Sequence, residues 1–170
     1  MKANCWVQYS GEVAETLKEE IAVALAKEGI AIVPPGGNDA GCLGICFIAS
    51  PSGDAKFPFG NSEDHVIAVI MALSGPSQLE GWGLLLAGAA DVLYWTDLDK
   101  VALQIKARFQ RKLFVDKLFE NSVLGDVVVG ISRTWRSLLR DIAEIAHFGD
   151  TPILLMGESG TGKEVTARLV

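Results

Sequence analysis

LGICFIA, which spans Leu43 to Ala49, is the stretch of sequence that decides the fold, and VIAVIMA, from Val66 to Ala72, repeats its character. Neither run contains a charged side chain, whereas a strand with one solvated face would alternate apolar and polar residues. Such continuous apolar runs are typical of strands that are buried on both faces of a parallel sheet covered by helices. The two runs therefore predict central strands of an α/β domain.

Shorter β-prone runs on either side predict three more strands: Cys5–Tyr9, Ile30–Val33 and Asp91–Trp95. Apolar residues at helical spacing predict one helix over Val13–Leu25 and another over Ser77–Ala87, and Gly29 stands where a glycine often ends a helix. Strands joined by such short crossovers predict an α/β fold, a doubly wound parallel five-stranded sheet of the receiver or flavodoxin type.

The composition bounds what the chain can do. Hydrophobic residues make up 49% of the sequence and charged residues 21%, so a sizeable core is expected. The net charge of −6 disfavours a nucleic-acid surface, which needs an excess of Lys and Arg against phosphates. No apolar run reaches the roughly 18 residues of a membrane span, and the N-terminus lacks a signal-peptide pattern, so a cytoplasmic location without membrane contact is expected.

The cysteines and histidines show no pattern of disulfides or metal ligands. Cys5, Cys42 and Cys46 are an odd number without paired spacing, which favours small buried residues in a reducing compartment. His65 and His147 stand apart from any cluster with metal-ligand spacing. No metal site is therefore predicted.

A long helix is predicted over Leu98–Glu120, where apolar residues form one stripe: Leu98, Val101, Ile105, Phe109 and Leu113. Its first part is expected to pack on the sheet, with Lys and Arg residues on the solvated side. The stripe continues beyond the length that such packing needs, so we expect the rest of the helix to pair with the same helix of a second copy. The sequence therefore predicts a homodimer through this helix.

The last part of the sequence contains a phosphate-binding motif. An apolar strand is predicted over Ile153–Met156, and the pattern G-x-x-x-x-G-K follows it in these residues: Gly157, Glu158, Ser159, Gly160, Thr161, Gly162, Lys163 and Glu164. Glycines let backbone N–H groups approach phosphate oxygens, the next helix adds a favourable dipole, and Lys163 adds a positive charge. Glu164 replaces the Ser or Thr whose hydroxyl usually binds Mg²⁺. The motif predicts an ATP phosphate-binding loop.

This form of the motif, GESGTGKE, resembles the AAA+ domain of bacterial enhancer-binding activators that act on sigma-54 RNA polymerase. The run DTPILLMGESGTGKEVTARL (Asp150–Leu169) matches that family without gaps, and VVGIS (Val128–Ser132) is similar to its opening segment. The resemblance implies that Val129 and Gly130 lie near the adenine. Ser132 is placed to cap the next helix, whose predicted apolar face consists of Trp135, Leu138, Leu139, Ile142 and Ile145.

The resemblance also implies a division between the intact parent protein and this sequence. ATP and Mg²⁺ belong to the parent, and contacts with sigma-54 RNA polymerase and DNA lie in regions outside the sequence. Phosphoryl transfer needs a metal, a positioned water and a neutralising arginine, and the few residues after Lys163 do not supply them. We therefore expect a truncated piece of the ATPase that is not catalytic and does not hold ATP well, so that no cofactor stays bound to it by itself.

The segment AGAADVLYWTDLDKVALQI (Ala87–Ile105) resembles the end of a response-regulator receiver domain. Receivers use an acidic pair, a phosphorylated aspartate, a hydroxyl and a lysine. Here Trp95 stands at the lysine position, and at most one carboxylate, Glu12, follows the first strand. No phosphoacceptor and no metal-binding pair is therefore predicted, although Asp39 or Asp54 could take over from a shifted loop.

These features together predict three parts. They are a receiver-like regulatory domain over residues 1–97, a linker and dimerisation helix over 98–121, and the N-terminal fragment of an AAA+ ATPase domain over 122–170. The predicted function is a regulatory module that controls oligomerisation of the polymerase-remodelling ATPase in a sigma-54-dependent transcription activator. Two alternatives stay open: a receiver that a histidine kinase phosphorylates, and a small autonomous P-loop ATP-binding protein.

Two further stretches could contact a ligand or a partner. Pro34–Gly44 (PPGGNDAGCLG) is either a contact loop or a long turn between strands, and its Gly and Pro favour the turn. The aromatic residues Trp82, Tyr94 and Trp95 could form a contact surface. Core packing accounts equally well for Trp82, because a helix would place it on one face with Leu79 and Leu86.

Overall fold

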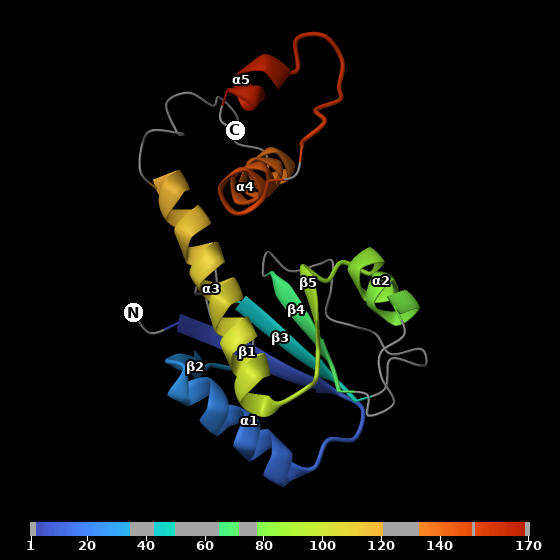
Figure 1. Ribbon diagram of the computed structural model, residues 1–170, viewed down its shortest axis with the longest axis vertical. Helices are drawn as coiled ribbons and strands as arrows, with labels where there is room; N and C mark the ends of the chain where they lie inside the picture. Colours follow the sequence, from blue (N-terminus) through green and yellow to red (C-terminus); the bar gives the residue numbers. More distant parts are fainter. Residues whose placement is uncertain are drawn as a thin grey trace. The chain divides into compact units, whose positions relative to one another are not determined.

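The computed structural model describes residues 3–34, 43–49, 65–71, 78–120, 133–150 and 152–168. The chain divides into two compact units, Met1–Phe109 and Gln110–Val170 (Figure 1). The apolar stripe predicted one long helix, and α3 (Leu98–Glu120) confirms it. This helix contributes residues to both units. The division into residues 1–97, 98–121 and 122–170 stays a prediction. In the described part of the chain, no helix combines the length and the apolar character that crossing a membrane requires.

The first unit contains a sheet of five parallel strands, which confirms the predicted fold class. The strands are β1 (Ala3–Ser10), β2 (Ile30–Ile32), β3 (Leu43–Ile48), β4 (Val66–Ile70) and β5 (Asp91–Tyr94). Their spatial order is β2-β1-β3-β4-β5. The chain therefore builds outward from β1 in both directions, as a doubly wound sheet does.

Every residue of β3 and β4 is buried, as the two apolar runs predicted. Successive side chains of a strand point to opposite faces of the sheet. Accordingly, Ile45 and Phe47 belong to one core cluster, whereas Cys46 and Ile48 belong to the other. The sheet thus separates two apolar layers, and neither layer has room for a charged side chain on these strands.

Helices cover both faces of this sheet (Figure 1). Helix α1 (Glu15–Lys27) buries Ile21, Ala24 and Leu25 in the same cluster as Ile105 of α3. Helix α2 (Gln78–Leu86) buries Leu84 in the other cluster. Gly29 follows α1 with a φ of 80°, the left-handed conformation in which a glycine ends a helix without steric cost, as predicted.

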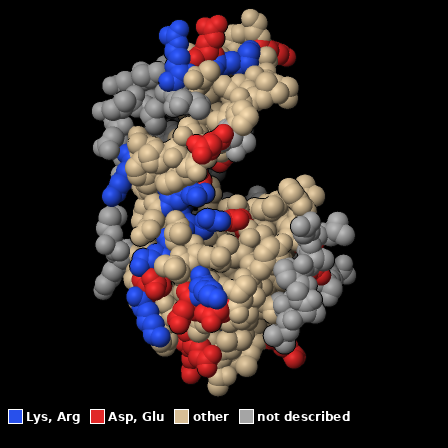
Figure 2. Space-filling model, in the orientation of Figure 1, with Lys and Arg blue, Asp and Glu red and all other residues tan. Residues whose placement is uncertain are grey.

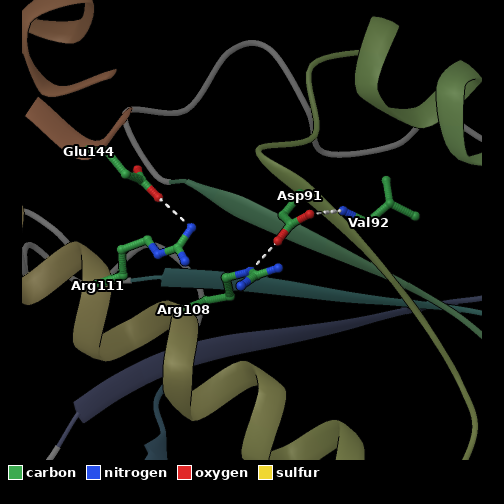
Figure 3. A network of polar contacts seen from close by, with 5 residues as sticks. All are labelled: Asp91, Val92, Arg108, Arg111 and Glu144. Atoms are coloured by element: carbon green, nitrogen blue, oxygen red, sulfur yellow. Dashed lines mark hydrogen bonds and ion pairs between the residues drawn. The ribbon is translucent and has the colours of Figure 1, made fainter. Parts of the chain in front are cut away.

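Two ion pairs attach the first half of α3 to its unit. Lys106 Nζ donates to Glu28 Oε2 at 2.7 Å, and the Arg108 guanidinium pairs with Asp91 at the start of β5 (Figure 3). Asp91 also accepts a hydrogen bond from the Val92 N–H at 2.8 Å. Basic side chains lie beside acidic ones on the face that Figure 2 shows, in keeping with such pairs. Partly exposed pairs stabilise a fold by at most about 1 kcal/mol each, so the apolar contacts of α3 matter more.

Of the two alternatives for Trp82, packing in the core is wrong. Trp82 is 64% exposed and Leu86 88% exposed, whereas Gly81 and Leu84 face the sheet. The reason is Tyr94 of β5, whose hydroxyl would lie less than 3.0 Å from a Cβ on Gly81. A glycine therefore faces the sheet, and the tryptophan on the next position turns to solvent.

The second unit contains the end of α3, helix α4 (Arg133–Phe148) and helix α5 (Lys163–Ala167). Within the predicted apolar face of α4, Leu139 and Ile142 are buried, but Leu138 and Ile145 are more than 40% exposed. The prediction of that face is therefore confirmed only for its central turn.

The strand predicted over Ile153–Met156 is not formed. These residues have no regular secondary structure, and Leu154 and Met156 are 80% and 84% exposed. A strand is stabilised by hydrogen bonds to a neighbouring strand. Among the residues that the structure describes between 110 and 170, none forms a strand that could supply them.

Candidate functional site

The carboxyl ends of the strands are the edge at which doubly wound sheets bind ligands, at the point where the strand order reverses. In this sheet that point lies between β1 and β3. Aromatic side chains occupy the edge: the Tyr9 ring stacks on Phe47 with centroids 5.6 Å apart, and Trp95 meets Phe47 edge-on at 6.3 Å. Phe47 is 1% exposed, and the other two rings pack against the same core cluster.

The polar groups that the sequence resemblance to receivers implies would fall at this edge of the sheet. Trp95, which stands at the position of the receiver lysine in the sequence resemblance, packs on Phe47. Glu12 follows β1 but is exposed, and β3 ends at Ile48 without a carboxylate. The described residues contain no group of three or more His, Cys, Asp or Glu that could hold a metal ion. Asp39 and Asp54, the two alternative acceptors, lie outside the described residues, as does Cys42.

Two charged side chains approach the aromatic edge from α1. The Lys18 ammonium lies 5.3 Å from the centroid of the Tyr9 ring and pairs with Glu15 at 2.6 Å. Burial raises the pKa of the Tyr9 phenol, with smaller contributions from the charges of Glu15 and Cys5. The phenol is therefore neutral at physiological pH and acts here as a packing group, not as an acid or base.

The phosphate-binding motif forms a loop that closes on itself. Gly160 and Gly162 have φ values of 83° and 82°, which only glycine adopts at no steric cost. The Thr161 hydroxyl donates to the Glu158 carbonyl at 2.9 Å across the loop. Lys163 Nζ donates to the Gly157 carbonyl at 2.9 Å and to the Glu158 carbonyl at 2.5 Å. The backbone of the motif thus curls around the Lys163 ammonium group.

This arrangement leaves donors for an anion. Among the hydrogen bonds that join backbone groups of the described residues, none is donated by the N–H groups of Gly160, Gly162 or Lys163. The loop residues from Gly157 to Thr161 are exposed, so a ligand can approach them. Glu164, at the Mg²⁺-binding position of the generic motif, is also exposed. The loop can therefore offer N–H groups and one ammonium to phosphate oxygens.

The remaining candidates are only partly described. Val129 and Gly130, the residues that the resemblance places near the adenine, lie outside the described residues, and so does Ser132, the predicted cap of α4. Most of the stretch Pro34–Gly44 lies outside them as well. His147 packs on the ring of Phe114 at a centroid distance of 4.1 Å, and His65 precedes β4.

Sequence reasoning missed the aromatic edge and the Thr161 contact. A signal for the edge existed in the sequence, because Tyr9 and Phe47 stand at the penultimate positions of two strands that parallel pairing brings side by side. The contact from Thr161 to Glu158 depends on loop dihedral angles, which the motif pattern does not specify.

Comparisons with known proteins add little beyond this geometry. No protein-family model matches the sequence, and no curated protein is similar to it at a significant level. Among solved structures, the chain is similar to NtrX from Brucella abortus in complex with ADP, at 18% identity and a TM-score of 0.48. It is also similar to NtrX from the same organism in complex with ATP, at 21% identity and a TM-score of 0.46. Each match covers 99% of this chain and 40% of the NtrX chain.

Proposed function

We propose that the chain is a regulatory part of an ATP-dependent transcription activator of the sigma-54 type. In this proposal, a receiver-like domain without a phosphoacceptor precedes a loop that binds the phosphates of ATP. The observation that carries the proposal is the closed loop Gly157–Glu164, in which Lys163 lies against two backbone carbonyls. Among the described residues, the N–H groups of Gly160 and Gly162 donate to no backbone carbonyl. The resemblance of GESGTGKE to enhancer-binding activators supplies the class of protein.

Phosphate binding in this loop would replace the carbonyl acceptors of Lys163 with phosphate oxygens. A carbonyl oxygen carries only a partial negative charge, so a phosphate oxygen is the stronger acceptor for the Lys163 ammonium. The N–H groups of the loop would then donate to the same phosphate. Because the preceding Ile153–Met156 segment has no strand partner among the described residues, the loop is weakly supported, and we expect a dissociation constant on the order of 1 mM.

Hydrolysis of ATP and the contacts with RNA polymerase and DNA are, in this proposal, properties of the intact parent protein. The regulatory part acts through non-covalent contacts, because among the described residues β3 ends without a carboxylate that could accept a phosphoryl group. It controls how the ATPase domains assemble, and α3 contributes by pairing with α3 of a second copy.

The test of the proposed phosphate site is an NMR titration of the ¹⁵N-labelled full chain with ATP. We expect saturable shifts of the amide signals of Gly160 to Glu164 at millimolar ATP. Lys163→Ala should abolish them, whereas Lys27→Ala, which removes an exposed lysine on α1, should leave them unchanged. Unchanged loop signals at 10 mM ATP would contradict the proposal, and submicromolar binding would instead favour the autonomous ATP-binding protein.

The absence of phosphorylation is tested separately. The full chain is incubated with acetyl phosphate and Mg²⁺, and its intact mass is measured. We expect no adduct, because aspartyl phosphorylation needs an available carboxylate beside a bound metal. A gain of about 80 Da, the mass of one phosphoryl group on such a carboxylate, would support the receiver that a kinase phosphorylates.

A further inference from the structure

The Thr161 side chain connects the beginning of the phosphate-binding loop with its end. Its hydroxyl donates to the Glu158 carbonyl at 2.9 Å, and its Oγ1 lies 3.4 Å from Lys163 Nζ. The same oxygen lies close to Gly157, since a Cβ built on that glycine would be 3.0 Å from it. One hydroxyl group therefore contacts the first two residues of the motif and approaches its lysine.

The Glu158 carbonyl accepts hydrogen bonds from two side chains. Lys163 Nζ donates to it at 2.5 Å, beside the bond from the Thr161 hydroxyl at 2.9 Å. A carbonyl oxygen has two lone pairs, so it can accept both donors at once. The curled shape of the loop is therefore held by a charge-assisted bond from the lysine and by a neutral bond from the threonine.

The glycines of the loop make these side-chain bonds necessary. Gly160 and Gly162 have φ values of 83° and 82° in the curled loop, but a glycine adopts negative φ values as readily. A glycine also loses more conformational freedom on ordering than any other residue. The backbone of the loop therefore opposes a single curled conformation, and contacts from side chains are needed to hold it.

A bound phosphate would affect the two bonds differently. Its oxygens are stronger acceptors than a carbonyl, so they would draw the Lys163 ammonium away from Glu158. The Thr161 hydroxyl has no net charge and gains less from such an exchange, so it would keep its bond to the carbonyl. The loop would then lose the bond from the lysine and retain the bond from the threonine.

We propose that Thr161 is a positioning residue for phosphate, whose hydroxyl keeps the loop curled while Lys163 moves from the backbone carbonyls to the ligand. The inference rests on the proposed function, because it assumes that the loop binds the phosphates of ATP. Without the hydroxyl, ATP would have to bind a loop that is not held in one shape. The ordering of that loop would then reduce the affinity, because binding has to offset its entropy.

The first measurement is made on the ¹⁵N-labelled full chain without ATP. Lys163→Ala removes the charged bond and leaves the hydroxyl bond alone, so the amide order parameters of Gly160 and Gly162 should stay near about 0.8, the range of an ordered backbone. Adding Thr161→Val to that variant should lower them below about 0.6, the range of a flexible backbone. Adding Thr161→Ser instead should leave them unchanged, because serine keeps the hydroxyl.

The second measurement is the dissociation constant for ATP, from an NMR titration of chains that all keep Lys163. Thr161→Val should raise it by about fivefold, which corresponds to the net contribution of one hydrogen bond. Thr161→Ser should bind ATP as the wild type does, and this rescue separates the hydroxyl from the packing of the methyl group. Thr16→Val, the same substitution at an exposed threonine of α1, is the matched control and should change nothing.

The outcomes separate the inference from the proposed function. If the wild type and Thr161→Val bind ATP equally well, or Thr161→Ser binds as weakly as Thr161→Val, the loop binds phosphate without the hydroxyl and the inference is overturned. The same holds if Lys163→Ala alone makes the loop flexible. If the wild-type loop binds no ATP although the order parameters change as expected, the hydroxyl only shapes the loop, and the proposed phosphate site is wrong as well.

Discussion

Replacing Gly44 with alanine is expected to destabilise the sheet, because the indole of Trp6 lies against this position. Gly44 of β3 stands directly opposite Trp6 of β1 in the strand register. An added Cβ would lie 2.7 Å from both Cε2 and Cη2 of the ring, closer than real Cβ atoms approach other atoms. The ring is rigid and only 6% exposed, so it cannot turn aside without leaving the core.

The size of the effect follows from two opposing terms. Overpacking a core costs about 1–3 kcal/mol, and contacts with several atoms of one rigid ring place this site near the upper limit. Alanine in a strand regains about 0.5–1 kcal/mol relative to glycine, because the unfolded chain has less freedom to lose. We therefore expect a net loss of about 2 kcal/mol in the free energy of unfolding, measured by urea unfolding with far-UV circular dichroism.

A double-mutant cycle checks the cause. Trp6→Phe removes the atoms Cζ2 and Cη2, so Gly44→Ala should cost at least about 1 kcal/mol less in that background. Gly83→Ala is the control, since its Cβ would meet nothing within 4 Å, and helix propensity predicts a gain of about 0.5–1 kcal/mol. A loss below about 0.5 kcal/mol for Gly44→Ala, or the same loss in both backgrounds, would refute the reasoning.

Three other predictions follow from buried groups. Gly81→Ala should lower the free energy of unfolding by about 1 kcal/mol in the urea assay, and Tyr94→Phe should restore much of it by removing the hydroxyl that the new Cβ would meet. Burial raises the pKa of the Cys46 thiol to about 11, so iodoacetamide at pH 8 should leave Cys46 unmodified in the folded chain and alkylate it in urea, as read by peptide mapping. Because this pKa is raised above the usual value of 9.0, the free energy of unfolding should fall as the pH rises from 9 toward 11. Cys46→Ala should make that fall less steep, and an equally steep fall in the variant would show that other groups cause it.

The parts of the fold that sequence predicted are those in which a single pattern decides. Continuous apolar runs identified β3 and β4 because burial on both faces excludes polar residues from every position. The bounds of α3 were predicted by periodicity, since an apolar stripe spaced for a helix fits no other element. The turns at Gly160 and Gly162 could be located by the motif, because glycine positions report a backbone conformation directly, whereas phosphate binding by this loop stays a prediction.

The parts that sequence did not predict depend on contacts between distant residues. The orientation of α2 follows from one tyrosine on β5, and no spacing within the helix records that contact. The Ile153–Met156 segment has the composition of a strand, but strand formation requires a neighbour as well as a composition. For the same reason, the residues of α3 that meet α4 could be recognised as apolar but not assigned to a partner.

The order of the strands has a consequence for how the protein is made. β1 pairs with β2 on one side and with β3 on the other, although β3 ends 38 residues after β1. At a synthesis rate of about 5–20 residues per second, one edge of β1 stays unpaired for about 2–8 s until β3 has been synthesised. Once β3 has paired with β1, the other edge of β3 stays unpaired until β4 has been synthesised. Both of these strands are apolar throughout. The growing chain therefore presents its most aggregation-prone edge between the synthesis of β3 and that of β4, and a chaperone would be needed most at that stage.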